Sequence, residues 1–162
     1  MKIPSHPASE IKGLVFLLLS LLLGLSLFTY YPGDHVYGIN SAESGAVRNL
    51  FGIAGAHIAG YLFLMIGFSS FWPVIIFLSM AIASFRGRPT LPPLKGIVAA
   101  VCLVISFSGL MNLQLGNETH YRDGIISSGG LAGYISIPLK GFLNGFGANV
   151  FLIAVFVICL ML

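Results

Sequence analysis

The sequence predicts an all-α integral membrane protein with four transmembrane helices and an amphipathic outer-face helix between spans three and four. Two observations predict this class. Residues 13–31, 49–85, 96–116 and 141–162 contain no Lys, Arg, Asp or Glu. The chain is 57% hydrophobic and 8% charged, whereas an ordinary globular domain is about 25% charged. Each charge-free stretch is long enough to cross a hydrocarbon core about 30 Å thick, where an ionised side chain costs roughly 2.5–3.5 kcal/mol.

The first span is expected to run from about Glu10 to Tyr30. A tail with two prolines, residues 1–9, precedes it and is expected to be cytoplasmic, and residues 10–162 form the membrane domain. A Pro-Gly-Asp turn at residues 32–34 ends the span. The apolar run is long for a signal peptide and no small-x-small cleavage site follows, so an uncleaved helix is predicted.

The second charge-free stretch is too long for one perpendicular span, because residues 49–85 would measure about 55 Å as a single helix. The span proper is expected to begin near Ala59, and Pro73 is expected to kink it. A stripe of small residues runs along this stretch: Gly52, Ala56, Gly60 and Gly67. Such spacing lets helix backbones approach closely in lipid. The stripe predicts helix packing, either within the bundle or with another copy or a partner.

The third span is expected to run from Gly96 to about Leu113, after a short proline-rich cytoplasmic turn. Its outer end carries Ser106, Ser108 and Asn112, which predict hydrogen bonds between helices worth under about 1 kcal/mol each.

An amphipathic helix is predicted over residues 131–146, with a start signal in Ser-Ser-Gly-Gly at residues 127–130. Its apolar residues recur at helical spacing: Leu131, Tyr134, Ile135, Leu139, Phe142 and Phe146. Ser136, Lys140 and Asn144 form a polar row opposite them. We expect this helix to lie on the outer membrane surface or to dip into it, with a bend at Pro138.

The last apolar run, residues 147–162, measures about 24 Å as a helix and has no polar residue or basic stop after it. An end inside the bilayer predicts that the chain is a piece of a longer protein.

The distribution of charge predicts the orientation of the bundle. With four spans, the N-terminus, residues 86–95 and the C-terminus share one side, which carries five Lys or Arg and one Glu. The other side carries three Lys or Arg and four Asp or Glu. The positive-inside rule therefore predicts that both termini are cytoplasmic.

The sequence predicts no catalytic, cofactor-binding or metal site. It contains no P-loop motif and no pair of carboxylates within a span. Cys102 and Cys159 lie in apolar runs and are expected to be buried small hydrophobes. His57 is expected to be a partly solvated interfacial residue, and His35 and His120 lie in outer loops, where a shared metal site is the alternative.

Three segments form an ordered set of motifs along the chain. LSLFTYYPGD at residues 25–34 closes the first span, and NLFGIAGAHIAGYLFLMIG at residues 49–67, followed by Pro73, opens the second. GGLAG at residues 129–133 and GFGA at residues 145–148 lead into the fourth. Their order and spacing over most of residues 10–162 resemble the membrane domain of the FtsK/SpoIIIE family of DNA translocases. His35, where a proline often stands, and Gly60, where an acidic residue is common, depart from the family pattern.

The resemblance implies the N-terminal, four-span membrane anchor and assembly domain of a septal DNA translocase, which couples chromosome segregation to cell division at the bacterial inner membrane. In that family a linker, a hexameric ATP-driven DNA pump and a winged-helix domain follow. ATP, Mg²⁺ and DNA would therefore be bound by a motor that this chain lacks, and the chain itself would be no enzyme. Its own partners would be the lipid bilayer, further copies of itself and other divisome membrane proteins.

Two other classes stay open at this stage. A small oligomeric transporter or channel subunit is the main alternative, because the outer segment is rich in glycine and the outer end of span three is polar. An intramembrane enzyme is the other, although Ser127 and Ser128 have no histidine in a later span to act as a base.

Overall fold

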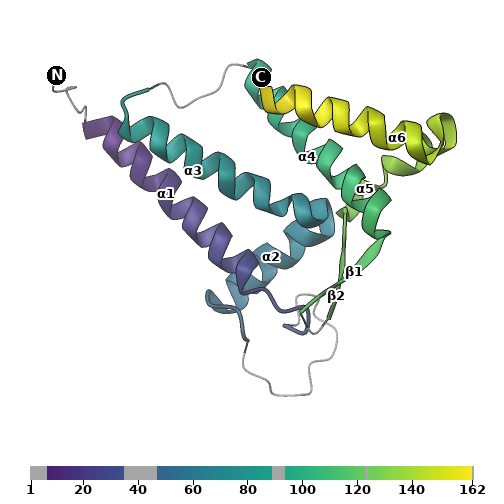
Figure 1. Cartoon of the computed structure of the whole chain (residues 1–162). Helices are drawn as coiled ribbons and strands as arrows, with labels where there is room; N and C mark the ends of the chain where they lie inside the picture. The colour runs from purple at the N-terminus through teal and green to yellow at the C-terminus, as the bar shows by residue number, and fades with distance from the viewer. Residues whose placement is uncertain (1–6, 35–46, 89–93, 123, 162) are drawn as a thin grey trace.

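Four long apolar helices form two antiparallel pairs in the computed structural model, which describes residues 7–34, 47–88, 94–122 and 124–161 (Figure 1). In chain order the elements are α1 (Pro7–Phe28), α2 (Gly52–Ile66), the 3-10 helix η1 (Gly67–Ser70), α3 (Phe71–Phe85), α4 (Leu94–Leu115), β1 (Glu118–Tyr121), β2 (Gly124–Ser127), α5 (Gly130–Gly133) and α6 (Ser136–Met161). Four spans, Ala8–Phe28, Gly52–Phe85, Leu94–Leu115 and Ser136–Met161, are long and apolar enough to cross a membrane. The predicted all-α membrane class is confirmed.

The bundle has two distinct ends. We call the end that carries strands β1 and β2 the hairpin end, and the end where α1 begins and α6 ends the terminal end (Figure 1). Most of the predicted tail, the loop at residues 35–46 with His35, and the turn at residues 89–93 lie outside the described residues.

The first pair consists of α1 and α3. A Cβ at Gly13 would lie 2.9 Å from the ring of Phe85, so the absence of a side chain there lets the two helices meet near the terminal end. Ser20 Oγ donates to the carbonyl oxygen of Val74 at 3.0 Å. Such contacts matter in lipid, where close packing and hydrogen bonds replace the hydrophobic effect between helices.

The second pair consists of α4 and α6. A Cβ at Gly109 would lie 3.0 Å from Leu152, and Gln114 Nε2 donates to Asn149 Oδ1 at 2.8 Å. The two pairs meet at an aromatic cluster. Trp72 of α3 lies 5.8 Å from Phe107 of α4 and 5.6 Å from Phe156 of α6, measured between ring centroids.

Crosslinking of the two cysteines would test the pairing of α4 with α6. Cys102 of α4 and Cys159 of α6 are both free thiols, and their side chains interact. We expect a short bismaleimide to join them within one chain, with the crosslinked peptides identified by mass spectrometry. Cys102→Ser and Cys159→Ser should each abolish the product. A product only between differently tagged copies would contradict the α4–α6 pairing.

The second span is broken at η1. The α3 segment alone measures about 22 Å, which is shorter than a hydrocarbon core of about 30 Å, so η1 and part of α2 must lie at membrane depth. Gly67 has φ +57° and ends the helical path of α2. The expected kink therefore lies at residues 67–70 and not at Pro73, which occupies the first turn of α3, where a proline removes no intrahelical hydrogen bond.

A β-hairpin, which the sequence did not predict, closes the hairpin end. Strands β1 and β2 are antiparallel, with Glu118 opposite Ser127 and Tyr121 opposite Gly124. The hairpin packs on the main hydrophobic core, whose buried members are Leu27, Tyr30, Ala56, Ala59, Phe63 and Ile126. The ring of Phe63 lies 5.1 Å from that of Tyr30 and 5.3 Å from that of Tyr121, so this core joins α1, α2 and the hairpin.

The predicted amphipathic helix over residues 131–146 is divided in the structure. It begins with the four residues of α5, and α6 starts again at Ser136. Asn144, at φ 59° and ψ 172°, interrupts α6. Pro138 lies in the first turn of α6, where the ring is tolerated, so the bend expected at Pro138 lies at Asn144 instead.

The α6 helix is the least buried of the four spans. Only 11% of its most apolar part is buried inside the chain, against 22–39% for the other spans. Its remaining apolar surface therefore needs lipid or another protein to cover it.

Candidate functional site

Two polar clusters hold the hairpin end together. We call the first the junction: it consists of residues 67–70 of η1, Ser108 and Asn112 of α4, and residues 128–130, which lead into α5. We call the second the clasp: it consists of Thr29 and Asp34 after α1, and Asn49 before α2. The clasp falls entirely on motifs that carry the family resemblance, and the junction shares Gly67, Gly129 and Gly130 with them.

The junction supplies hydrogen bonds to the backbone at the helix break. In a bilayer, non-helical backbone is tolerated only where protein or water satisfies its polar groups. The backbone N–H of Phe68 donates to the carbonyl oxygen of Ser128 at 2.9 Å. Ser108 Oγ donates to the carbonyl oxygen of Ile66 at 2.9 Å, and Ser70 Oγ donates to that of Gly67 at 2.5 Å.

Ser69 joins the break to α4. Its Oγ is fully buried and donates to the carbonyl oxygen of Val104 at 3.0 Å, and it lies 2.8 Å from Ser108 Oγ. The break is therefore bonded to α4 on one side and to the residues before α5 on the other.

Glycines make this approach possible. A Cβ at Gly67 would overlap the carbonyl oxygen of Ser128, and a Cβ at Gly130 would lie 2.5 Å from the backbone nitrogen of Ile66. Both glycines have φ values near +60° (57° and 60°), a conformation that residues with a Cβ rarely adopt. A Cβ at Gly129 would overlap the carbonyl oxygen of Ser108. The GGLAG motif and Gly67 thus belong to one backbone-to-backbone contact.

Asn112 extends the junction to the start of α6. Its Nδ2 donates to Asn117 Oδ1 at 3.1 Å, and its Oδ1 accepts a hydrogen bond from Ser136 Oγ at 3.1 Å. Gly133 lies beside it, since a Cβ there would approach Asn112 Cβ to 3.0 Å. Asn112 and Ser136 are both buried, so this amide fixes the orientation of α6 relative to α4.

Removing one hydroxyl from the junction is expected to weaken the bundle modestly. Ser108→Ala should lower the free energy of unfolding by about 1 kcal/mol, the usual scale for one interhelical hydrogen bond in a membrane. SDS titration of the purified chain measures it. A double-mutant cycle with Ser69→Ala should give a non-zero coupling energy, whereas Ser79→Ala, whose hydroxyl is exposed and bonds only within its own helix, should change little. Equal losses for Ser108 and Ser79 would contradict this role.

The clasp ties the segment before α2 to the end of α1. Asp34 is 6% exposed, and its two carboxylate oxygens accept hydrogen bonds from the backbone N–H groups of Arg48 and Asn49, each at 3.0 Å. Asn49 in turn donates from Nδ2 to the carbonyl oxygen of Ser26 at 2.8 Å. A Cβ at Gly55 would overlap Asn49 Oδ1, so the glycine makes room for this amide.

The hairpin caps the C-terminal end of α1. Tyr121 Oη donates to the carbonyl oxygen of Leu27 at 3.1 Å, and Arg122 Nη2 donates to that of Phe28. The last carbonyl groups of a helix lack intrahelical partners, and a cation is favourable beside them. The guanidinium of Arg48 lies 4.3 Å from the ring centroid of Tyr31, which adds a cation–π contact next to the clasp.

The predicted small-residue stripe faces several environments. Ala56 and Gly60 are buried within the chain, and Gly67 lies in the junction. Gly52, at φ +59°, begins α2, and a Cβ there would have nothing within 4 Å. A role for this stripe in contact with another copy stays a prediction.

The residues of the predicted amphipathic surface are mostly exposed. They are Leu131, Tyr134, Ile135, Phe142 and Phe146, with Leu139 half-buried. Phe142 and Phe146 are 88% and 82% exposed, so their rings are scarcely covered by the rest of the described chain.

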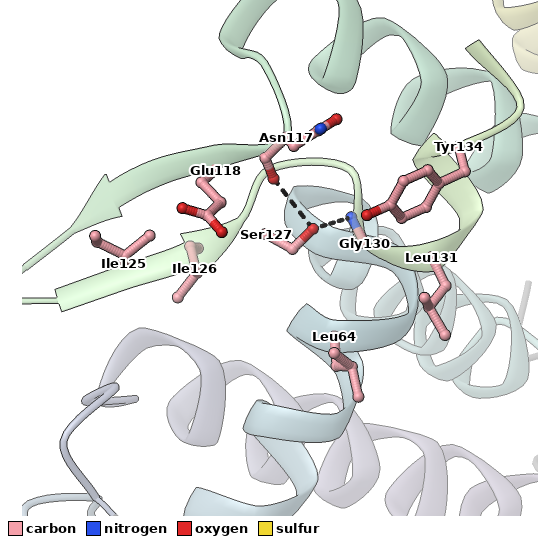
Figure 2. Close-up of a pocket in the computed structure, with 9 residues that line it drawn as sticks. All are labelled: Leu64, Asn117, Glu118, Ile125, Ile126, Ser127, Gly130, Leu131 and Tyr134. Atoms are coloured by element: carbon pink, nitrogen blue, oxygen red, sulfur yellow. Dashed lines mark hydrogen bonds between the residues drawn. The ribbon is translucent and has the colours of Figure 1, made fainter. Parts of the chain in front are cut away.

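A cavity of about 220 Å³ lies between the hairpin, α2 and α5 (Figure 2). Figure 2 shows Ser127 at its centre, where Oγ donates to the carbonyl oxygen of Asn117 at 3.3 Å and accepts from the backbone N–H of Gly130 at 3.0 Å. The cavity is below the roughly 300 Å³ of ordinary ligand sites. In the part of the chain that the structure describes, no three His, Cys, Asp or Glu side chains gather around a metal position.

The described polar side chains thus bind mainly the chain's own backbone, and they define a multi-pass membrane bundle built around an internal helix break. The chain belongs to the family of the 4TM region of DNA translocase FtsK/SpoIIIE, whose model matches residues 5–162. Comparisons with curated proteins and with solved structures gave no significant match. The matched region is the membrane-spanning part of the translocase and not its motor, so the chain is a membrane-anchoring part of a DNA translocase.

Proposed function

We propose that this chain holds a DNA-translocating motor at the division septum of a bacterium, and that it thereby couples chromosome segregation to cell division. The family match over residues 5–162 carries the proposal. The motor, with its ATP and Mg²⁺, belongs to a segment outside this chain, and DNA is contacted only through that motor.

We further propose that both termini lie in the cytoplasm. Five Lys or Arg lie on the side that holds the N-terminus, residues 86–95 and the C-terminus, and they support this orientation through the positive-inside rule. Single cysteines at Ser41 and Thr90 in a cysteine-free chain test it. A membrane-impermeant maleimide added to intact spheroplasts should label position 41 and not position 90. Labelling of both from one side contradicts four alternating spans.

Self-association is the third part of the proposal. The low burial of α6 supports it, because an apolar helix with so little cover inside its own chain has surface to offer to another copy. Association of anchors would raise the effective concentration of the motor subunits attached to them. Differently tagged chains in the same nanodiscs should crosslink at low protein density. Monomers at every density would contradict this part.

Localisation tests the septal role itself. A fluorescent fusion of residues 1–162, expressed in a dividing bacterium, should concentrate at the septum. The matched control is the same fusion carrying Gly67→Leu, which disrupts the junction while leaving all four apolar segments in place. Uniform distribution of the unchanged fusion in the cell membrane would contradict a septal role. Ion or solute flux through liposomes that contain the purified chain would instead favour a transporter or channel subunit.

A further inference from the structure

We propose that the pocket between the end of α4 and the start of α6 binds the headgroup of an anionic phospholipid. The pocket has a volume of about 530 Å³, within the range of about 300–1,000 Å³ that is usual for ligand sites. Its polar lining includes Asn112, Asn117, Ser136 and Lys140. The inference goes beyond the anchoring function, because it concerns one specific lipid contact and does not depend on a motor or a septum.

The charge of the pocket favours a negatively charged group. Lys140 is exposed, and it is the single cation among the described residues that line the pocket, which include no carboxylate. Glu118, the nearest acidic residue in sequence to this lining, lines the smaller cavity, which shares Asn117 with the pocket (Figure 2). A lysine ammonium is a compact positive charge, and lysine commonly binds phosphate groups in proteins.

The amides of the pocket are already oriented by the junction. Asn112 uses its oxygen for Ser136 and its Nδ2 for Asn117 Oδ1. Because Asn117 Oδ1 accepts that bond, its own Nδ2 hydrogens are left to donate to a further acceptor. Lys140 and Asn117 can therefore both donate to the oxygens of one phosphodiester without disturbing the bonds that hold α6 to α4.

The position of the pocket places it at headgroup depth. It adjoins Asn112, Leu113 and Gly116, which mark the end of the apolar span Leu94–Leu115. Free anions are found in water, but this pocket opens where a membrane helix ends, so the phosphate nearest to it is that of a lipid.

Apolar surface for the acyl chains lies directly beside the lysine. Ile137, which lies three residues before Lys140 on the same side of α6, lines the pocket and is 55% exposed. A cation beside an exposed apolar side chain is typical of segments that bind anionic lipid at the interface.

Native mass spectrometry of the purified full chain tests the site. The probes are phosphatidylglycerol and phosphatidylcholine with identical acyl chains, glycerophosphoglycerol, which has the headgroup without acyl chains, and inorganic phosphate. We expect about fivefold tighter binding of phosphatidylglycerol than of phosphatidylcholine, the ratio that one lysine near an anionic lipid provides at about 1 kcal/mol. Glycerophosphoglycerol and inorganic phosphate should bind far more weakly than phosphatidylglycerol.

Two lysine variants provide the matched comparison. Lys140→Gln should abolish the preference for phosphatidylglycerol, and Lys140→Arg should retain it. Lys95→Gln removes an exposed lysine at the other end of α4 and should leave the preference unchanged. The proposal is overturned if Lys140→Gln keeps the preference, or if Lys95→Gln loses it equally. Inorganic phosphate that binds as tightly as the lipid would also overturn it, because the site would then be one for a free anion.

Discussion

Gly67→Ala is expected to lower the free energy of unfolding by at least about 3 kcal/mol, among the largest effects of any single methyl group in the described chain. The new Cβ would overlap the carbonyl oxygen of Ser128, a backbone atom that cannot rotate away as a side chain can. The residue would also have to keep φ +57° with ψ −136°, a sparsely populated region that costs an L-residue about 1–3 kcal/mol by itself. SDS titration followed by circular dichroism measures the loss.

Gly52→Ala is the matched control for this experiment. Gly52 has nearly the same backbone angle, φ +59°, but a Cβ there would meet nothing within 4 Å. Its substitution should cost only the conformational part, about 1–2 kcal/mol. The larger loss expected for Gly67→Ala then reflects the close contact between η1 and Ser128 together with the ψ of −136° at Gly67. Equal losses for Gly67 and Gly52 would show that the junction contributes nothing beyond backbone conformation.

Asp34→Ala is the second large effect, with an expected loss of about 3 kcal/mol. The buried carboxylate accepts two backbone hydrogen bonds, from Arg48 and Asn49, and hydrogen bonds to charged groups contribute about 1.5–3 kcal/mol each. Without it, the buried N–H of Asn49 has lost its acceptor, and the segment before α2 is no longer held to α1. Thermal unfolding of the purified chain measures the loss.

Two further carboxylate variants make this result specific. Asp34→Asn keeps one acceptor oxygen and should lose about half as much. Glu10→Ala removes an exposed carboxylate from α1 and should be close to neutral. If Glu10→Ala were as destabilising as Asp34→Ala, net charge and not the clasp would explain the loss.

The four spans could be predicted from the sequence because exclusion of charge from lipid acts on every residue of a span. The same reasoning located the excess length of the second stretch. The sequence did not locate the helix break at η1, because the kink of the second span was assigned to Pro73. A proline is harmless in a first turn, and the contact that excludes a Cβ at Gly67 comes from Ser128, about sixty residues later in the chain.

The hairpin and the divided amphipathic segment could not be predicted for a similar reason. Strands of four residues have little intrinsic stability, and β1 and β2 form on a core that Phe63 and Tyr30 provide. The periodicity of residues 131–146 predicts one helix, whereas the structure divides the segment between α5 and α6, and the interruption at Asn144 leaves no trace in a hydrophobic pattern.

The junction was predicted in its parts and not as a whole. Ser106, Ser108 and Asn112 were expected to bond to other helices. Ser108 bonds to α2 and Asn112 to α6, whereas Ser106 Oγ donates within α4, to the carbonyl oxygen of Leu103. Gly67 was assigned to helix packing, whereas its neighbour in space is the backbone of Ser128. Asp34 and Asn49 belonged to the recognised motifs, yet their contact spans a loop whose closure no local rule describes.

The break in the second span determines how this anchor bears mechanical tension. A straight transmembrane helix would transmit a force applied at its terminal end directly to the opposite surface of the bilayer. Here a force along α3 reaches η1, and the hydrogen bonds of Ser69 and Ser108 transmit part of it to α4. The two helix pairs therefore share such a force, and the buried hydroxyl groups of Ser69 and Ser108 are among the contacts that transmit it.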